Sequence, residues 1–352
     1  MNEQTIPKPL STEPPLLQVR DLRMYFPIVK GIFGSVKGYV RAADDINFEI
    51  ARGETLGLVG ESGCGKTTVG RTIVRAYKPT SGSILYYANG SQPVDLATLD
   101  EAELKPYRRE IRMIFQDPYS SLNPRMPVFE IVGEALRNLE EVSRTEMEDR
   151  VREALVRVGL RPEYIRRYPH AFSGGERQRI GLARALVTMP KLVVCDEAVS
   201  ALDVSVRAQV LNLMESLRQD LQLTYLFVSH DLSVIRYICD RVVVMYVGKI
   251  VEVAPVNALF MTPKHPYTEA LMSAVPIQNP RLRDRRTRIR LEGEIADPSN
   301  PPSGCYFHPR CRYMQPLCAE QAPHLREIRP GHWVACYLAD SLELAGASMM
   351  EA

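Results

Sequence analysis

The sequence lacks any apolar run long enough to cross a bilayer, and its start, Met1 to Leu17, is polar and proline-rich, unlike a signal peptide. An excess of charge of one sign is also missing, because 44 Lys and Arg against 42 Asp and Glu give a net charge of +2. This balance excludes a general electrostatic attraction to nucleic acid or lipid. We therefore expect a cytosolic protein that binds no nucleic acid and reaches a membrane only through a partner.

Cysteine is sparse until the tail of the chain. Cys64, Cys195 and Cys239 are scattered, whereas the other four of the 7 cysteines crowd together as Cys305, Cys311, Cys318 and Cys336. In a reducing compartment such a cluster indicates metal ligation rather than disulfides. The spacing lacks the paired C-x2-C knuckles typical of small zinc modules. Four thiolates suit either Zn²⁺ or a [4Fe–4S] cluster, and free buried thiols are the remaining alternative.

The organisation along the chain predicts an α/β domain with a smaller extension. The apolar fraction of 45% and charged fraction of 24% are those of an ordinary globular protein. We predict five parts: a disordered leader over 1–15, an α/β domain over 16–255, a helical subdomain within it at about 120–172, a Cys-containing extension over 256–340, and a tail over 341–352.

Three short apolar runs, Thr55 to Val59, Leu192 to Cys195 and Thr224 to Val228, are typical of buried parallel strands. Each ends at a glycine or polar residue, and such strands present chemistry at their carboxyl ends. Helical spacing over Glu146 to Leu160 predicts a helix whose apolar face carries Met147, Val151, Leu155 and Val158.

An arginine-rich run extends from Arg281 to Arg290 and has six arginines and one aspartate. A solvated linker is the simpler interpretation. Contact with anionic lipid headgroups beside a membrane partner is the alternative.

A glycine-rich loop follows the first of these strands and matches G-x-x-x-x-G-K-[ST]. Its backbone N–H groups and the helix start after it would cradle phosphates, Lys66 would meet the β and γ phosphates, and Thr67 would ligate Mg²⁺. The sequence thus predicts ATP binding. The residues assigned to the nucleotide here are Gly60, Glu61, Ser62, Gly63, Cys64, Gly65, Lys66, Thr67 and Thr68.

The second strand ends in two acids, Asp196 and Glu197. Asp196 would hold Mg²⁺ through water, and Glu197 would polarise the attacking water as general base. An apolar strand ending in acids is weak evidence alone but strong beside the glycine-rich loop.

A second anion site is predicted where Ser173, Gly174, Gly175 and Glu176 open a helix expected over Glu176 to Thr188. Two phosphate-binding helix starts in one chain are unusual for a simple kinase or GTPase. They are explained if two subunits face each other, with each nucleotide between one subunit's loop and the other's serine–glycine turn.

This combination resembles the nucleotide-binding domain of ABC transporters, a P-loop NTPase fold, over about residues 16–255. The resemblance implies that Gln116 senses Mg²⁺ and the transporter contact, that His230 contacts the γ-phosphate, and that Asp203, in Ser-Ala-Leu-Asp, lies at the dimer interface. Phe26 or Tyr25 would stack on adenine, with Phe26 aligning better.

The chain departs from the family pattern at two places. Phe172 and Glu176 replace the leading Leu and final Gln of the LSGGQ signature, and Ala198 and Val199 replace the usual Pro-Thr after the catalytic acid. Because Ser173 and both glycines remain, we expect the phosphate turn to survive.

Further motifs resemble the ATP-binding subunits of bacterial oligopeptide and dipeptide importers, and more the second, F-type subunit. They are Phe115 to Arg125, His265 to Thr268, Leu271 to Pro276 and Asn300 to Cys305. For the tail cysteines this resemblance favours the iron–sulfur cluster, as a structural staple. The same branch includes importers of nickel, glutathione and other solutes.

The resemblance implies a peripheral ATPase on the cytoplasmic face of the inner membrane. Its partners would be a second ATPase subunit, a paralogue in a heterodimer, two transmembrane permeases and an extracytoplasmic substrate-binding protein. A permease helix would rest near Gln116 and the segment Tyr119 to Val128. Closure of the ATPase dimer around ATP would drive the permeases, and hydrolysis at Glu197 would reset them. A soluble ABC ATPase of repair or translation and an exporter subunit are the rival interpretations.

Overall fold

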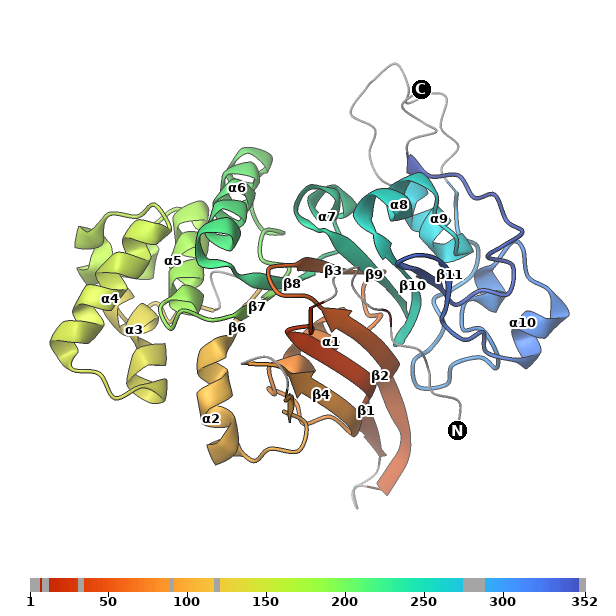
Figure 1. The fold of residues 1–352 in the computed structure, drawn as a ribbon, viewed down its shortest axis with the longest axis horizontal. Coiled ribbons are helices and arrows are strands. Elements are labelled where there is room, and N and C mark those ends of the chain that lie inside the picture. The colour runs from red at the N-terminus through yellow and green to blue at the C-terminus, as the bar shows by residue number, and fades with distance from the viewer. Residues whose placement is uncertain are drawn as a thin grey trace. The chain divides into compact units, whose positions relative to one another are not determined.

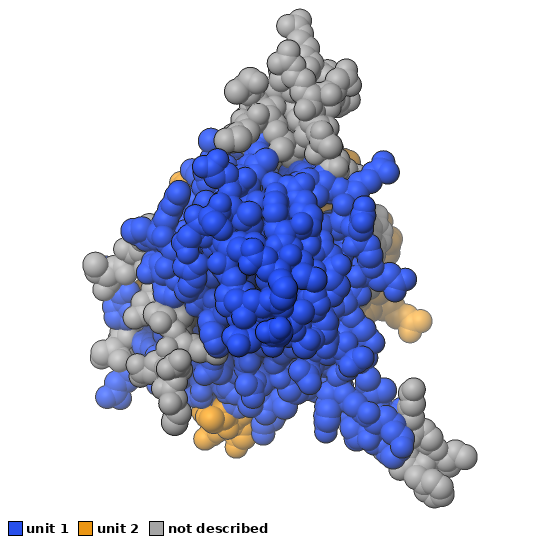
Figure 2. All heavy atoms as spheres, turned by 90° about the vertical axis from the view of Figure 1, so that its right-hand side faces the viewer, with its two compact units in different colours: residues 1–51, 56–97, 229–352 blue, residues 52–55, 98–228 orange. Residues whose placement is uncertain are grey.

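The computed structural model describes residues 7, 13–30, 35–88, 92–116, 121–274 and 289–347. Most of the predicted leader and of the arginine-rich run, and residues 119–120 of the predicted permease contact, lie outside the described residues. The chain divides into two units, coloured separately in Figure 2: residues 1–51, 56–97 and 229–352 form the first, and residues 52–55 and 98–228 the second.

The first unit opens with a four-stranded antiparallel sheet in the order β2-β1-β4-β5. Its strands are β1 (Leu17–Lys30), β2 (Ser35–Ile50), β4 (Ser81–Tyr86) and β5 (Val94–Asp95). The two long strands β1 and β2 run side by side in Figure 1 and contribute fully buried residues to the core, among them Leu17 and Phe48.

A second run of strands in the first unit has the order β11-β12-β10-β9-β3. Its members are β3 (Thr55–Val59), β9 (Arg241–Tyr246), β10 (Lys249–Pro255), β11 (Arg326–Arg329) and β12 (His332–Val334). β3 and β9 are parallel, whereas β9, β10, β12 and β11 pair antiparallel. β12, from the last part of the chain, therefore pairs with β10, and β11 pairs with β12.

The helices of the first unit are short. They are α1 (Lys66–Ile73), α7 (Leu232–Ile238), α8 (Val256–Met261), α9 (Pro266–Ser273), the 3-10 turn η4 (His308–Arg310) and α10 (Pro316–Glu320). The large apolar side chains Tyr246, Tyr267 and Phe307 are buried together here, with ring centroids about 5 Å apart.

The second unit combines three parallel strands with the longer of the described helices. β7 (Leu192–Asp196) pairs with β6 (Ile111–Ile114) on one side and with β8 (Thr224–Val228) on the other, all in parallel. The helices are α2 (Glu101–Glu110), α3 (Val128–Leu139), α4 (Arg144–Arg157), η1 (Pro162–Arg166), η2 (Pro169–Ala171), α5 (Gly174–Leu186) and α6 (Val204–Leu221).

A helical subdomain is present, with α3, α4 and α5 packed on one another (Figure 1). Ser143 caps α4 by accepting a hydrogen bond from the Glu146 N–H, and the four apolar residues predicted for its inner face are all buried. The predicted α/β class with a helical subdomain is therefore confirmed. The domain boundaries given above stay predictions.

Candidate functional site

The phosphate loop, residues 60–67, joins β3 to α1 in the first unit. A Cβ atom on Gly60 would lie 2.2 Å from the carbonyl oxygen of Met245, and one on Gly65 would lie 1.9 Å from that of Ala42. Gly65 also has a left-handed φ of 105°. Only glycine fits these two positions, because any side chain would displace the backbone packed against the loop.

Lys66 is buried and turned back onto its own loop. Its Nζ donates to the carbonyl oxygens of Gly60 at 2.8 Å and Glu61 at 2.9 Å. Thr67 and Thr68 lie in the first turn of α1, whose N-terminal N–H groups carry partial positive charge. This arrangement suits an anionic ligand. Burial raises the pKa of the Cys64 thiol, which therefore stays neutral.

The two aromatic candidates for adenine stacking have different surroundings. The Tyr25 hydroxyl donates a hydrogen bond to Asp44, and its backbone N–H donates to Thr80 Oγ1 at 2.9 Å. Phe26 is half-buried and meets Tyr77 edge-on at 5.5 Å between ring centroids. Tyr25 is thus fixed by its hydroxyl group, which favours Phe26 as the stacking ring.

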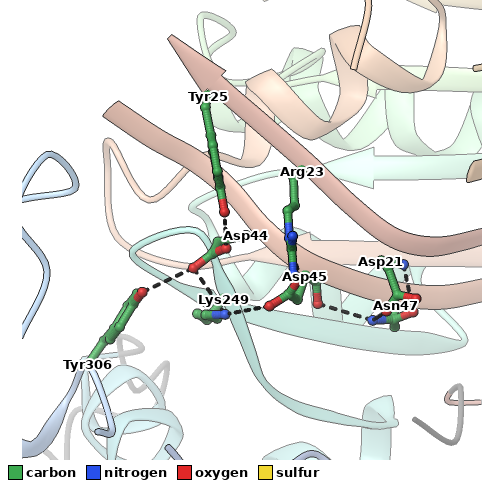
Figure 3. A network of polar contacts seen from close by, with 8 residues as sticks. All are labelled: Asp21, Arg23, Tyr25, Asp44, Asp45, Asn47, Lys249 and Tyr306. Atoms are coloured by element: carbon green, nitrogen blue, oxygen red, sulfur yellow. Dashed lines mark hydrogen bonds and ion pairs between the residues drawn. The ribbon is translucent and has the colours of Figure 1, made fainter. Parts of the chain in front are cut away.

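Asp44 is the centre of a polar network that sequence reasoning missed (Figure 3). Besides the Tyr25 hydroxyl, it binds Lys249 Nζ at 3.0 Å and the Tyr306 hydroxyl at 3.0 Å. Burial opposes ionisation of Asp44, but the hydrogen bond from Tyr25 and the charge of Lys249 outweigh it and lower its pKa. Asp44 is therefore an anion held by three partners.

The acids of the second unit lie at the carboxyl end of β7. Asp196 is buried, and Glu197 follows it with a left-handed φ of 50°. Gln116 Nε2 donates to Glu197 Oε2 at 2.7 Å, while the Glu197 N–H donates to the Val228 carbonyl at 2.9 Å. The structure therefore brings two of the predicted residues, Gln116 and Glu197, into direct contact.

The serine–glycine turn begins α5, two residues before the predicted helix start. Ser173 Oγ accepts from the Glu176 N–H at 3.3 Å, and Glu176 Oε2 accepts from the Ser173 N–H at 2.9 Å. Glu176 also accepts from the Ser173 hydroxyl at 2.9 Å. These contacts form a capping box, so a carboxylate of the chain itself occupies donors at this helix start.

The turn packs closely against the start of α6. A Cβ on Gly175 would lie 2.4 Å from Val206 Cγ1, which leaves no room for a side chain there. Asp203 caps α6 by accepting from the Val206 N–H at 3.0 Å, and this bond lowers its pKa. A cavity of about 310 Å³ beside the turn is lined by Ser173, Glu176 and Arg179, among others.

His230 lies between Ser229 and Asp231 in the first unit and is exposed. The Ser229 N–H donates to the Leu58 carbonyl at 3.2 Å, and the Asp231 N–H donates to Ser229 Oγ at 3.0 Å. Asp231 then caps α7. The turn that carries His230 is thus fixed on both sides.

The four tail cysteines line one cavity of about 20 Å³, together with His265 and Phe307. They are free thiols, and burial raises the pKa of Cys305 to about 11 and that of Cys336 to about 12. In the part of the chain that the structure describes, no group of three or more His, Cys, Asp or Glu side chains is placed to hold one metal ion. A donor set of four thiols suits Zn²⁺ or a [4Fe–4S] cluster.

Two residues of the C-terminal extension that sequence reasoning missed touch the phosphate loop. The Tyr267 hydroxyl accepts from the Glu61 N–H at 2.8 Å, and Arg310 binds the Glu61 carboxylate at 2.7 Å and 3.1 Å. Tyr267 lies within the segment His265 to Thr268, whose resemblance to the importers was the available signal. Nothing in the sequence around Arg310 indicates its partner.

Profiles of two families match the chain. That of the ABC transporter family matches residues 43–200, and that of the oligopeptide/dipeptide transporter C-terminal region matches residues 251–318. Among the described residues, no helix has the length and apolar character needed to cross a membrane.

Several curated proteins are similar over nearly their whole length. The oligopeptide transport ATP-binding protein AppF of Bacillus subtilis is 51% identical, with 92% of this chain and 97% of AppF covered. A putative peptide import ATP-binding protein of Brucella ovis is 49% identical, with 92% and 98% covered.

Solved ABC cassettes share the fold. CbiO1 of Clostridium perfringens, part of an ABC transporter complex, has a TM-score of 0.58 at 27% identity and covers 70% of this chain and 91% of its own. The dimeric cassette MJ0796, bound to ADP and Pi, has a TM-score of 0.58 at 26% identity and covers 68% and 98%. With the phosphate loop, the paired acids and the capped serine–glycine turn in place, the chain belongs to the ABC transporter family, among the ATP-binding proteins of the oligopeptide/dipeptide branch.

Proposed function

We propose that this chain is the F-type ATPase subunit of an importer for di- or oligopeptides, in which ATP hydrolysis powers translocation. The observation that carries the proposal is the near full-length similarity to AppF, which includes the oligopeptide/dipeptide C-terminal region as well as the ATPase core. The names of the relatives favour peptides over nickel or glutathione.

In this proposal each motif residue has one task in ATP hydrolysis. Lys66 binds the β and γ phosphates, Thr67 and Asp196 hold Mg²⁺, and Phe26 stacks on adenine. Glu197 polarises the attacking water. The hydrogen bond from Gln116 to Glu197 supports this role, because it holds and orients the carboxylate. His230 contacts the γ-phosphate.

The serine–glycine turn acts across a dimer of ATPase subunits. Residues 173–176 and Asp203 would meet the nucleotide held by a second subunit, a paralogue of this chain. Two permeases, contacted near Gln116, and an extracytoplasmic substrate-binding protein complete the complex. The ATPase would then lie peripherally on the cytoplasmic face of the inner membrane.

The test of hydrolysis is Glu197→Gln in the assembled complex. Loss of the general base should lower the ATPase rate by about 10²- to 10⁴-fold while ATP binding is kept. Glu153→Gln is the matched control, because Glu153 is exposed on α4 and pairs there with Arg157, away from the acids of β7 in the sequence. Near-normal hydrolysis in Glu197→Gln would show that the base is misassigned, and transport of nickel but not of peptides by the complex would refute the substrate class.

We further propose that Cys305, Cys311, Cys318 and Cys336 hold a [4Fe–4S] cluster that staples the tail. Four thiols that line one cavity support it. Bound iron would supply the positive charge that buried thiolates need.

Anaerobically purified protein should be brown, contain about four irons per chain and lose tail order in Cys305→Ser. Cys239→Ser is the control, because Cys239 is buried away from the tail cluster and should leave the iron content unchanged. Colourless protein with stoichiometric zinc would show that the four cysteines hold zinc instead of the cluster. Metal-free protein with an ordered tail would refute both alternatives.

A further inference from the structure

Residues 305–311, here called the bridge segment, begin and end at two of the clustered cysteines. The bridge segment contacts the nucleotide-binding part of the first unit at two points. Tyr306 contacts Asp44, and Arg310 contacts Glu61 of the phosphate loop. Phe307, between them, is 1% exposed and packs against the rings of Tyr246 and Tyr267 at 5.3 Å and 5.4 Å. The bridge segment is therefore anchored in the core and fixed at both ends.

The Arg310 contact has the geometry of a specific pair. Its two terminal nitrogens meet the two oxygens of Glu61 at 2.7 Å and 3.1 Å, and the side chain of Arg310 is only 7% exposed. A planar guanidinium that meets a carboxylate with both nitrogens fixes orientation as well as distance. Because this pair is largely sheltered from water, dissolved salt screens its attraction less than that of a surface ion pair.

Three groups of Glu61 are held at once. Its carboxylate is bound by Arg310, its N–H donates to the buried Tyr267 hydroxyl at 2.8 Å, and its carbonyl accepts from Lys66 Nζ at 2.9 Å. The first two partners come from the C-terminal part of the chain, and the third is the lysine assigned to the phosphates. The position of Lys66 is thus coupled through one loop residue to Tyr267 and Arg310.

The second contact of the bridge segment is that of Tyr306 with Asp44. Tyr306 and Tyr25 approach the same carboxylate from two different elements, and Lys249 approaches it from a third (Figure 3). Tyr25 precedes Phe26, the ring assigned to adenine. The bridge segment therefore touches the phosphate loop directly, at Glu61, and reaches Tyr25, the neighbour of Phe26, through Asp44.

We infer that the bridge segment preorganises the phosphate loop, with Arg310 and Tyr267 as positioning residues whose bonds to Glu61 set the affinity of the loop for ATP. This inference rests on the proposed function, because it takes the loop to be the ATP site. A loop already held in its binding conformation spends less free energy on ordering when the nucleotide arrives. Removing either contact should weaken nucleotide binding without changing the chemical step.

The cleanest variant is Tyr267→Phe, because it removes one hydroxyl and keeps the ring that packs on Tyr246 and Phe307. Arg310→Gln removes the charge and one arm of the fork. The dissociation constant of a fluorescent ATP analogue should rise about 10-fold in Arg310→Gln and roughly 3-fold in Tyr267→Phe. In the assembled complex, KM for ATP should rise by the same factors with kcat unchanged. Arg310→Lys should recover part of the affinity.

Arg326→Gln is the matched control. It also breaks an ion pair of the tail, with Asp340, but that pair is exposed and does not involve the phosphate loop. Its nucleotide affinity should equal that of the wild type. In the double variant Glu61→Gln with Arg310→Gln, affinity should fall no further than in Arg310→Gln alone, because both changes remove the same bond.

Two failures are distinguishable. A wild-type protein that binds no nucleotide would refute the proposed function itself. A wild type that binds, with Arg310→Gln and Tyr267→Phe binding equally well, would refute only the inference and reduce the contacts to structural packing. Lower thermal stability with unchanged nucleotide affinity would also refute only the inference, so melting temperatures are measured on the same samples.

Discussion

At the scale of single residues, Glu176 is the most informative departure from the family signature. Its carboxylate accepts from both the N–H and the hydroxyl of Ser173, at 2.9 Å each. Those two groups are donors that the proposal assigns to the phosphate of a facing nucleotide. The acid stabilises the start of α5, but it also places a negative charge where a polyphosphate is expected.

Glu176→Gln should therefore make the ATPase complex more active at sub-saturating ATP. Removing one charge from a water-accessible site is worth roughly 1 kcal/mol, which corresponds to about a five-fold gain in rate. The cap of α5 should weaken by only about 0.3–1 kcal/mol. Steady-state ATPase assays across ATP concentration measure the effect. Glu146→Gln, which alters a first-turn acid of α4 instead, is the control, and a loss of activity specific to Glu176→Gln would show that the cap matters more than the charge.

At the scale of elements, β2 connects the N-terminal sheet to distant parts of the chain through Asp44 and Asp45. Arg23 of β1 binds Asp45 at 2.5 Å, Lys249 of β10 binds both aspartates, and Tyr306 of the tail binds Asp44 (Figure 3). The lysine is thus shared between two carboxylates. One strand is thereby tied to three other segments by charged or hydroxyl groups.

The lowered pKa of Asp44 gives this connection a pH dependence. A carboxyl whose folded pKa lies below its unfolded value of about 3.8 stabilises the fold above that pH, and the stabilisation is lost as pH falls through the folded pKa. Asp44→Asn should be less stable than the wild type at pH 7, by about 1–3 kcal/mol. The difference should shrink as the pH falls below about 3.8 toward the lowered folded pKa, through which the wild-type carboxyl takes up its proton.

Urea unfolding at pH 7 and at pH 3 measures this difference. Asp149→Asn, on an exposed position of α4, should show no difference from the wild type at either pH. An equal loss of stability at both pH values in Asp44→Asn would mean that the geometry of the site matters and its charge does not.

At the scale of the whole molecule, the sequence predicts local features and misses distant partners. The loop between β3 and α1, the two acids at the carboxyl end of β7 and the buried face of α4 are each encoded within a few neighbouring residues, so spacing and residue type were enough to predict where they lie. Glu61 and Arg310 are 249 positions apart, and Asp44 and Tyr306 are 262 apart. No local sequence pattern predicts such a pairing, because it depends on how β10, β12 and the C-terminal extension fold back.

Within the first unit, the buried residue Glu252 holds later segments of the chain against β10. It is fully buried in β10 and accepts from the N–H groups of Lys264 at 2.8 Å and His265 at 2.9 Å. It also lies 2.7 Å from His332 Nε2 of β12. One carboxylate therefore holds the start of α9 and the strand that the tail adds to β10.

Glu252→Ala should loosen the tail by leaving these three buried nitrogens without their acceptor. Each unsatisfied group costs about 1–3 kcal/mol, and breaking a buried pair of this kind costs about 3–5 kcal/mol in all. The melting temperature should fall, and hydrogen exchange should rise first over β12 and α9. Glu294→Ala, an exposed change in the same tail, should leave both measurements unaltered. Because Tyr267 is in α9, Glu252→Ala should also weaken nucleotide binding. Loss of stability without faster hydrogen exchange in α9 would show that Glu252 does not anchor this part of the chain.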